Sequence, residues 1–176
     1  MTLERFERVG SVAEETLAWL RSSGHEALAD LLQAAGTGFV DDGFLRVIDP
    51  GSLAPHLDSL FEETAGAVPF ATTALGDIVL ARGSSVDVSQ LRNGQVVPFR
   101  PDPEAFLAAG SSWTVRLVHL DAISYMGLSR PELDRAYFAT PWEACGGSGD
   151  PETLREADLL TTWLAASRII GRAVLV

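Results

Sequence analysis

The stretch Pro69–Arg82, PFATTALGDIVLAR, decides the fold of this chain. It predicts two short strands that are joined at a corner. Gly76 and Asp77 separate two apolar runs, and Gly76 can adopt a positive φ because it has no Cβ, which suits a tight turn or a bulge. The following residues, Arg82–Ser85, predict a second turn before another strand. A hairpin is therefore predicted in the middle of the chain, with helix-like segments on both sides.

Further strands are predicted next to this hairpin. Gly43–Asp49 lies between turn-forming residues and is predicted to be the first strand. Val86–Val88 and Gln95–Phe99 follow the hairpin, and the Asn-Gly pair in Leu91–Gly94 suits a type I′ turn between them. About five strands in succession, joined by short turns, indicate an antiparallel meander, and we expect a sheet of about four to six strands.

Helices are predicted before and after the strands. Ser11–Leu20 begins with Ser11 as the N-cap and Glu14 as its capping-box partner. The other predicted helices are His25–Ala35, Ser52–Ala65, Pro103–Ala109 with Asp102 as its cap, and Pro151–Ile170.

Three stretches allow less definite predictions. Trp113–Met126 suits a helix or a strand, and a helix is favoured because a strand of that length would be unusual. Glu132–Phe138 suits a helical turn or a short strand, and Arg172–Val176 could add an edge strand.

The expected fold is therefore an α+β domain, with N-terminal and C-terminal helices packed on a central antiparallel sheet. A chain of 176 residues is expected to form a single domain over 1–176, with an N-terminal helical segment at 1–36 and the core at 40–170. The single cysteine, a charged N-terminal stretch and the lack of a long apolar run predict a cytoplasmic protein.

The chain carries a net charge of −11, and all 13 of its basic residues are Arg. This balance argues against direct binding to nucleic acid, because non-specific affinity for phosphates comes from clustered positive charge. It permits binding to a basic protein, although plain solubility would explain it too. If Asp41, Asp42, Asp77 and Asp87 lie along one edge of the sheet, they would form a negative face. We predict that such a face mimics phosphates and binds a nucleic-acid-degrading toxin.

Catalytic motifs are not evident in the sequence. CGGSGD at Cys145–Asp150 lacks the Gly-Lys-Ser/Thr ending of a phosphate loop, and the chain has no GxSxG, HExxH or CxxC pattern. We therefore predict no catalytic residue, no cofactor and no metal site. A small enzyme that uses His119 or Cys145 near Gly146 remains an alternative, and it would require one of these residues to lie in a concave pocket.

Two stretches carry a resemblance to a known family. Phe70–Asp77 matches a strand turn in which an aromatic residue precedes Thr-Ala-Phe-Gly-Asp, with Leu75 in place of the second aromatic residue. Later motifs of the family match, in the same order, Met126–Leu128, Glu132, Tyr137, Phe138, Pro141, Gly146, Gly147 and a helix from Glu152. On these residues the chain resembles the SUKH-like bacterial immunity proteins. Among them it is most similar to the family that protects against type VI secretion DNase toxins and carries a GAD-like segment.

The resemblance covers about residues 40–170 and departs from the family pattern at Asp134–Ala136, where the family has an Asp-Glu-aromatic cluster. It implies a non-enzymatic immunity protein that binds a cognate secreted toxin and neutralises it sterically, a nuclease being one candidate. The expected partner is that toxin, with no membrane or nucleic acid, and the chain itself is expected to be a monomer or a weak homodimer. The alternative is a regulatory protein-interaction module of the same fold. Partner contacts do not transfer within such a family.

Overall fold

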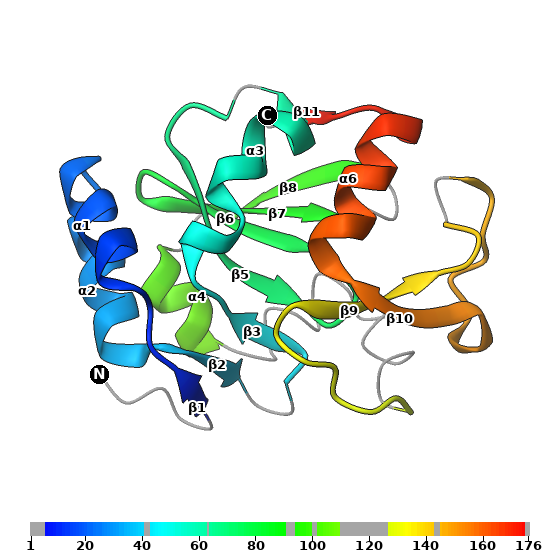
Figure 1. Ribbon diagram of the computed structural model, residues 1–176, viewed down its shortest axis with the longest axis horizontal. Coiled ribbons are helices and arrows are strands. Elements are labelled where there is room, and N and C mark those ends of the chain that lie inside the picture. The colour runs from blue at the N-terminus through cyan, green and yellow to red at the C-terminus, as the bar shows by residue number, and fades with distance from the viewer. Residues whose placement is uncertain are drawn as a thin grey trace.

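The computed structural model describes residues 6–40, 43–62, 64–90, 94–99, 102–109, 127–142 and 145–174. Over these residues, the protein has an α+β fold in which a seven-stranded antiparallel sheet is covered by helices on both faces (Figure 1). This confirms the predicted fold class. The sheet is larger than expected, because the sequence analysis did not identify the short strands β1 (Phe6–Gly10) and β2 (Thr37–Val40).

The spatial order of the sheet, β1-β2-β3-β5-β6-β7-β8, follows the order of the chain, so the predicted meander is confirmed. The other strands of this sheet are β3 (Leu45–Val47), β5 (Ala67–Thr73), β6 (Ile78–Arg82), β7 (Ser85–Gln90) and β8 (Gln95–Phe99). Two small sheets pair β9 (Arg135–Ala139) with β10 (Leu154–Asp158), and β4 (Phe61–Glu62) with β11 (Ala173–Val174).

Helices surround the sheet in two groups. The α-helices are α1 (Glu14–Ser22), α2 (Glu26–Ala35), α3 (Leu57–Leu60), α4 (Pro103–Ala109) and α6 (Leu159–Ile170). The 3-10 helices are η1 (Pro50–Ser52), η2 (Ala54–His56) and η4 (Pro151–Thr153). Figure 1 shows α1, α2 and α4 on one side of the sheet and α3 and α6 on the other.

The central hairpin of β5 and β6 forms as predicted. Gly76 has φ +80°, and a Cβ at this position would lie 2.2 Å from Cε1 of Phe138, so only glycine fits. The Nε1 of Trp163 on α6 donates a hydrogen bond of 2.6 Å to the carbonyl oxygen of Gly76. The corner of the hairpin is therefore the place where the sheet, β9 and α6 meet.

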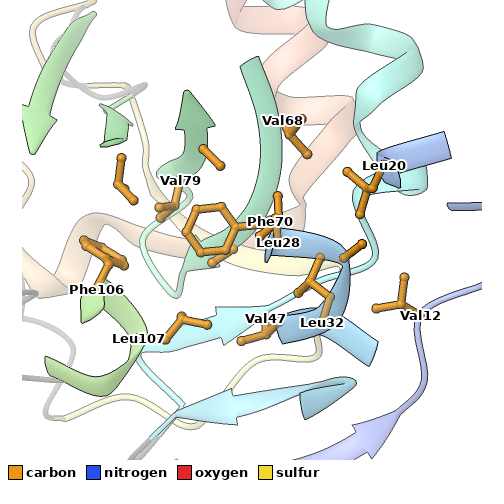
Figure 2. Packing of buried hydrophobic residues seen from close by; sticks show 14 of the residues in the cluster. Val12, Leu20, Leu28, Leu32, Val47, Val68, Phe70, Val79, Phe106 and Leu107 are labelled. Atoms are coloured by element: carbon orange, nitrogen blue, oxygen red, sulfur yellow. The ribbon is translucent and has the colours of Figure 1, made fainter. Parts of the chain in front are cut away.

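Each face of the sheet buries its own apolar cluster, as the alternation of side chains along a strand requires. Val47, Ala71, Val79 and Val88 are aligned across four strands and belong to the cluster that packs against α1, α2 and α4 (Figure 2). The opposite face contributes Ile78 and Leu80 to a cluster with residues of α3 and α6.

Two of the predicted helices were wrong over part of their length. Ser52–Ala65 is divided into η2, α3 and β4, because Pro55 has no N–H to donate and Phe61 leaves the helix to pair with Ala173. Pro151–Ile170 begins with η4 and β10, and α6 starts only at Leu159, after Asp158 has capped it through a hydrogen bond from the Thr161 N–H.

Other local predictions have mixed outcomes. α4 is confirmed together with its cap, since Oδ1 of Asp102 accepts a 2.8 Å hydrogen bond from the Ala105 N–H. Ser11 is not the N-cap of α1, because the helix begins after Ala13. Glu132–Phe138, which was predicted as a helical turn or a short strand, overlaps the strand β9. Ala173–Val174 forms the predicted C-terminal strand. Trp113–Met126 lies outside the described residues.

A buried arginine connects the sheet to the segment before β9. Arg46 on β3 is fully buried, and its Nη1 donates to the carbonyl oxygens of Glu132, at 3.0 Å, and of Arg135. Its Nη2 donates to the carbonyl oxygen of Thr73 on β5. A single guanidinium group thus satisfies three backbone acceptors, one on β5 and two at or just before the start of β9, which an apolar side chain could not do.

We predict that Arg46→Met lowers the free energy of unfolding by about 3 kcal/mol, because the buried carbonyl groups lose their donor. Chemical denaturation followed by circular dichroism measures the change. Arg155→Met is the matched control, since Arg155 is exposed and donates to the nearby carbonyl groups of residues 152 and 154. An Arg46→Met protein as stable as this control would contradict the account.

Candidate functional site

Two of the four carboxylates that the sequence analysis selected are buried. Asp77 and Asp87 are only 0 % and 3 % exposed. Asp77 accepts a 2.9 Å hydrogen bond from the hydroxyl group of Thr73 and so fixes the corner of the hairpin. Asp41 and Asp42 lie outside the described residues. The prediction that Asp77 and Asp87 lie on an exposed face is therefore wrong, because the sheet buries both side chains.

Asp87 lies within the sheet, on β7. Burial raises the pKa of its carboxyl group, and the charge of Arg82, whose Nη1 lies 3.5 Å away, partly opposes this effect. A carboxylate in this position supports the packing of β6 and β7 and is not offered to a partner.

Cys145 lies in an exposed segment after β9. Its thiol is free and exposed, and its backbone N–H donates a 2.8 Å hydrogen bond to the carbonyl oxygen of Trp142. It lines neither of the two cavities described below. His119, the other residue of the enzyme alternative, lies outside the described residues.

The main candidate site is a cavity of about 410 Å³ at the start of α6. It lies where η1, the segment before β9 and the first residues of α6 converge, and we call it the acidic pocket. Its lining residues are Ser11, Thr37, Ile48, Asp49, Ser52, Leu53, Leu133, Asp134, Asp158, Leu159 and Leu160. This size falls in the range of small-molecule and side-chain binding pockets.

Three carboxylates line the acidic pocket, and two of them are fixed by the backbone. Asp49 accepts hydrogen bonds of 2.9 Å from the Ala13 N–H and 2.8 Å from the Gly51 N–H. Asp158 accepts a 2.7 Å hydrogen bond from the Thr161 N–H. Hydrogen bonding to Thr161, aided by the charge of Arg135, lowers the pKa of Asp158 below its ordinary value. Both carboxylates are therefore held in place, and the lowered pKa favours the ionised form of Asp158.

The third carboxylate, Asp134, is exposed and open to a ligand. Its backbone carbonyl accepts a 2.8 Å hydrogen bond from the Leu159 N–H, whereas within the described ranges no hydrogen bond reaches its carboxylate. Arg46 holds the carbonyl groups of Glu132 and Arg135, which flank Asp134 and Leu133. The buried arginine thus positions the side of the pocket that carries this free carboxylate.

The composition of the pocket indicates which ligand it suits. None of its lining residues is basic, and the nearby Arg135 is engaged with Glu156 through a 2.6 Å ion pair. The remaining lining side chains are hydroxyl-bearing or aliphatic. Among the described residues, no three His, Cys, Asp or Glu side chains are grouped so that they could hold a metal ion. The pocket therefore favours an organic cation with an apolar stem.

A second hollow of about 370 Å³ lies between α1 and the short helices η1 and η2. It is lined by Glu15, Thr16, Trp19, Gly51, Ala54 and Pro55. Trp19 is 38 % exposed, so its indole ring is accessible to a ligand. An exposed indole beside a carboxylate attracts cations through its π face as well as through charge. Both hollows thus attract positive charge.

Sequence reasoning missed the three carboxylates of the pocket. Asp49 was assigned to a turn, Asp158 to the interior of a helix, and Asp134 only to a departure from a family pattern. The one local signal was available at Asp158, where an N-cap residue precedes an apolar helical stretch. The convergence of the three could not be predicted because they come from distant parts of the chain.

Comparisons with known proteins inform the fold alone. No protein-family model matches the chain, and no curated protein is similar to it. Among solved structures, the crystal structure of Atu4351 from Agrobacterium tumefaciens is similar, with a TM-score of 0.71 and 15 % sequence identity. The match covers 95 % of this chain and 87 % of that one. The fold described above is therefore one that an experimental structure shares.

A helix needs about 20 mostly apolar residues to cross a bilayer. In the part of the chain that the structure describes, no helix is long and apolar enough to do so.

We predict that Asp158→Ala lowers the free energy of unfolding by about 1 kcal/mol at neutral pH, because α6 loses its N-cap. Asp158→Asn should retain most of the stability, since Asn caps a helix as well as Asp does. The lowered pKa of Asp158 implies a contribution that is present above the ordinary value of 3.8 and is lost as the pH falls through the folded-state pKa.

Denaturant titrations at several pH values measure these differences. The gap between wild type and Asp158→Ala should narrow in acid. A gap that widens as the pH falls would contradict the assigned role of the cap.

Proposed function

We propose that this protein is a binding protein without chemistry of its own, and that it acts as an immunity protein against a basic, cognate secreted toxin. The observation that carries the proposal is the acidic pocket, which presents three carboxylates and no basic residue in a chain of net charge −11. The family resemblance supplies the toxin as the partner, and the pocket supplies a place where a cationic partner would be anchored.

Charge also supports a nuclease as the toxin. An enzyme that cleaves nucleic acid needs a basic groove to hold the phosphate backbone. A protein of opposite charge associates rapidly with such a groove and can cover it, which blocks the substrate without any reaction. A stable complex would bury on the order of 1,600 Å² in total, so the pocket would be one part of a larger interface. This role places the protein in the cytoplasm, where the nuclease would act.

The other function considered is a regulatory interaction module of the same fold. The same acidic pocket would serve a basic regulatory partner equally well. The two functions differ in whether loss of the protein exposes the cell to a toxin, and this difference can be measured directly.

We predict that co-expression with the product of the neighbouring gene rescues host growth and yields a complex that co-purifies. Because opposite charges drive the association, raising the salt from about 0.1 M to about 1 M should weaken the complex, as the Debye length falls from about 10 Å to about 3 Å. Growth assays and co-purification at both salt concentrations test this. A harmless neighbouring gene product, or one that does not bind, would overturn the immunity function and favour the regulatory module.

A further inference from the structure

We infer that the acidic pocket is the anchor site for an arginine side chain of the basic partner. The inference rests on the proposed function and specifies the chemistry of the contact. It follows from the volume and lining of the pocket and from the hydrogen bonds that its carboxylates already make.

Within the described residues, the carboxylates of the pocket do not form a metal-binding group. Asp49, Asp134 and Asp158 come from three separate segments. A guanidinium group carries five N–H donors in a rigid plane and can address several separated acceptors at once, whereas an ammonium group is a compact point charge. The arrangement of acceptors therefore favours arginine over lysine and over a metal ion.

The apolar part of the pocket suits the stem of the same side chain. Five aliphatic residues line it, and Leu53 and Leu159 among them belong to buried parts of the apolar core. An arginine can place its methylene groups along such a surface while its charged head contacts the carboxylates. The cavity of about 410 Å³ is large enough for one extended side chain and is too small for a folded element of the partner.

The three carboxylates would play different parts. Asp49 already accepts two backbone hydrogen bonds, so it supplies a fixed negative charge. Asp158 caps α6 through Oδ1, so its charge is held at the start of that helix, on the wall of the pocket. Asp134 uses only its backbone carbonyl within the described structure, so both carboxylate oxygens can receive a bidentate guanidinium group. Asp134 and Asp158 are therefore the residues to test.

The first test uses the isolated protein and small probes. We expect n-butylguanidinium to cause saturable NMR shifts of the Leu159 and Leu160 methyl groups, with a Kd on the order of millimolar. The neutral isostere n-butylurea should bind at least about tenfold more weakly, because it lacks the charge, and n-butylammonium should lie between the two. Equal binding of the urea, or stronger binding of the ammonium, would overturn the inference.

Matched variants then connect the pocket to the partner. Asp134→Asn with Asp158→Asn removes two charges, keeps the cap of α6 and keeps the backbone hydrogen bond at residue 134. Glu26→Gln with Glu104→Gln removes the same charge from exposed positions on α2 and α4, which do not line the pocket. We expect the first pair to weaken the complex about tenfold or more and the second pair to change it less than about threefold.

The outcomes separate the two proposals. Loss of butylguanidinium binding and of partner affinity in the pocket variant alone would support the inference. An unchanged partner affinity in that variant would overturn the pocket as the anchor, although the immunity function would stand. If the neighbouring gene product does not bind the wild type while butylguanidinium still binds the pocket, then the proposed function falls and the guanidinium chemistry of the pocket is supported.

Discussion

The fully buried guanidinium of Arg46 is the interaction on which the rest of the site depends. Burying a charged group is costly unless its donors find partners, and the buried Arg46 donates hydrogen bonds to the carbonyl groups of Thr73, Glu132 and Arg135. These acceptors belong to the sheet and to the segment before β9. One side chain therefore fixes that segment on the sheet, and with it the position of Asp134 at the acidic pocket.

The hairpin corner provides the second fixed point. Gly76 can be nothing but glycine, because Phe138 of β9 occupies the space of a Cβ, and its carbonyl receives the indole N–H of Trp163. The start of α6 is tied in addition by the Leu159 N–H, which donates to the carbonyl of Asp134. The pocket therefore forms between elements that are locked to the sheet, and the carboxylates of Asp49 and Asp158 are held by backbone hydrogen bonds before any partner arrives. Such preorganisation lowers the entropy cost of binding.

Local patterns predicted the meander, the central hairpin, α2 and α4, because each depends on turn chemistry or periodicity within a short stretch. The errors have a common cause. Pro151–Ile170 was predicted as one helix, but Leu154–Asp158 pairs with β9, and this pairing is not visible in the local sequence. The site was missed for a similar reason. Asp77 and Asp87 were selected for their charge, yet the sheet buries them, while the pocket gathers carboxylates from distant segments.

The central claim is that the acidic pocket is the face that meets a basic partner. The most direct measurement is hydrogen–deuterium exchange of the protein alone and in complex with the product of the neighbouring gene. The account predicts that added protection concentrates at residues 49, 52–53, 133–134 and 158–160, which line the pocket. Protection confined to the exposed surfaces of α2 and α4, with unchanged exchange around the pocket, would contradict it.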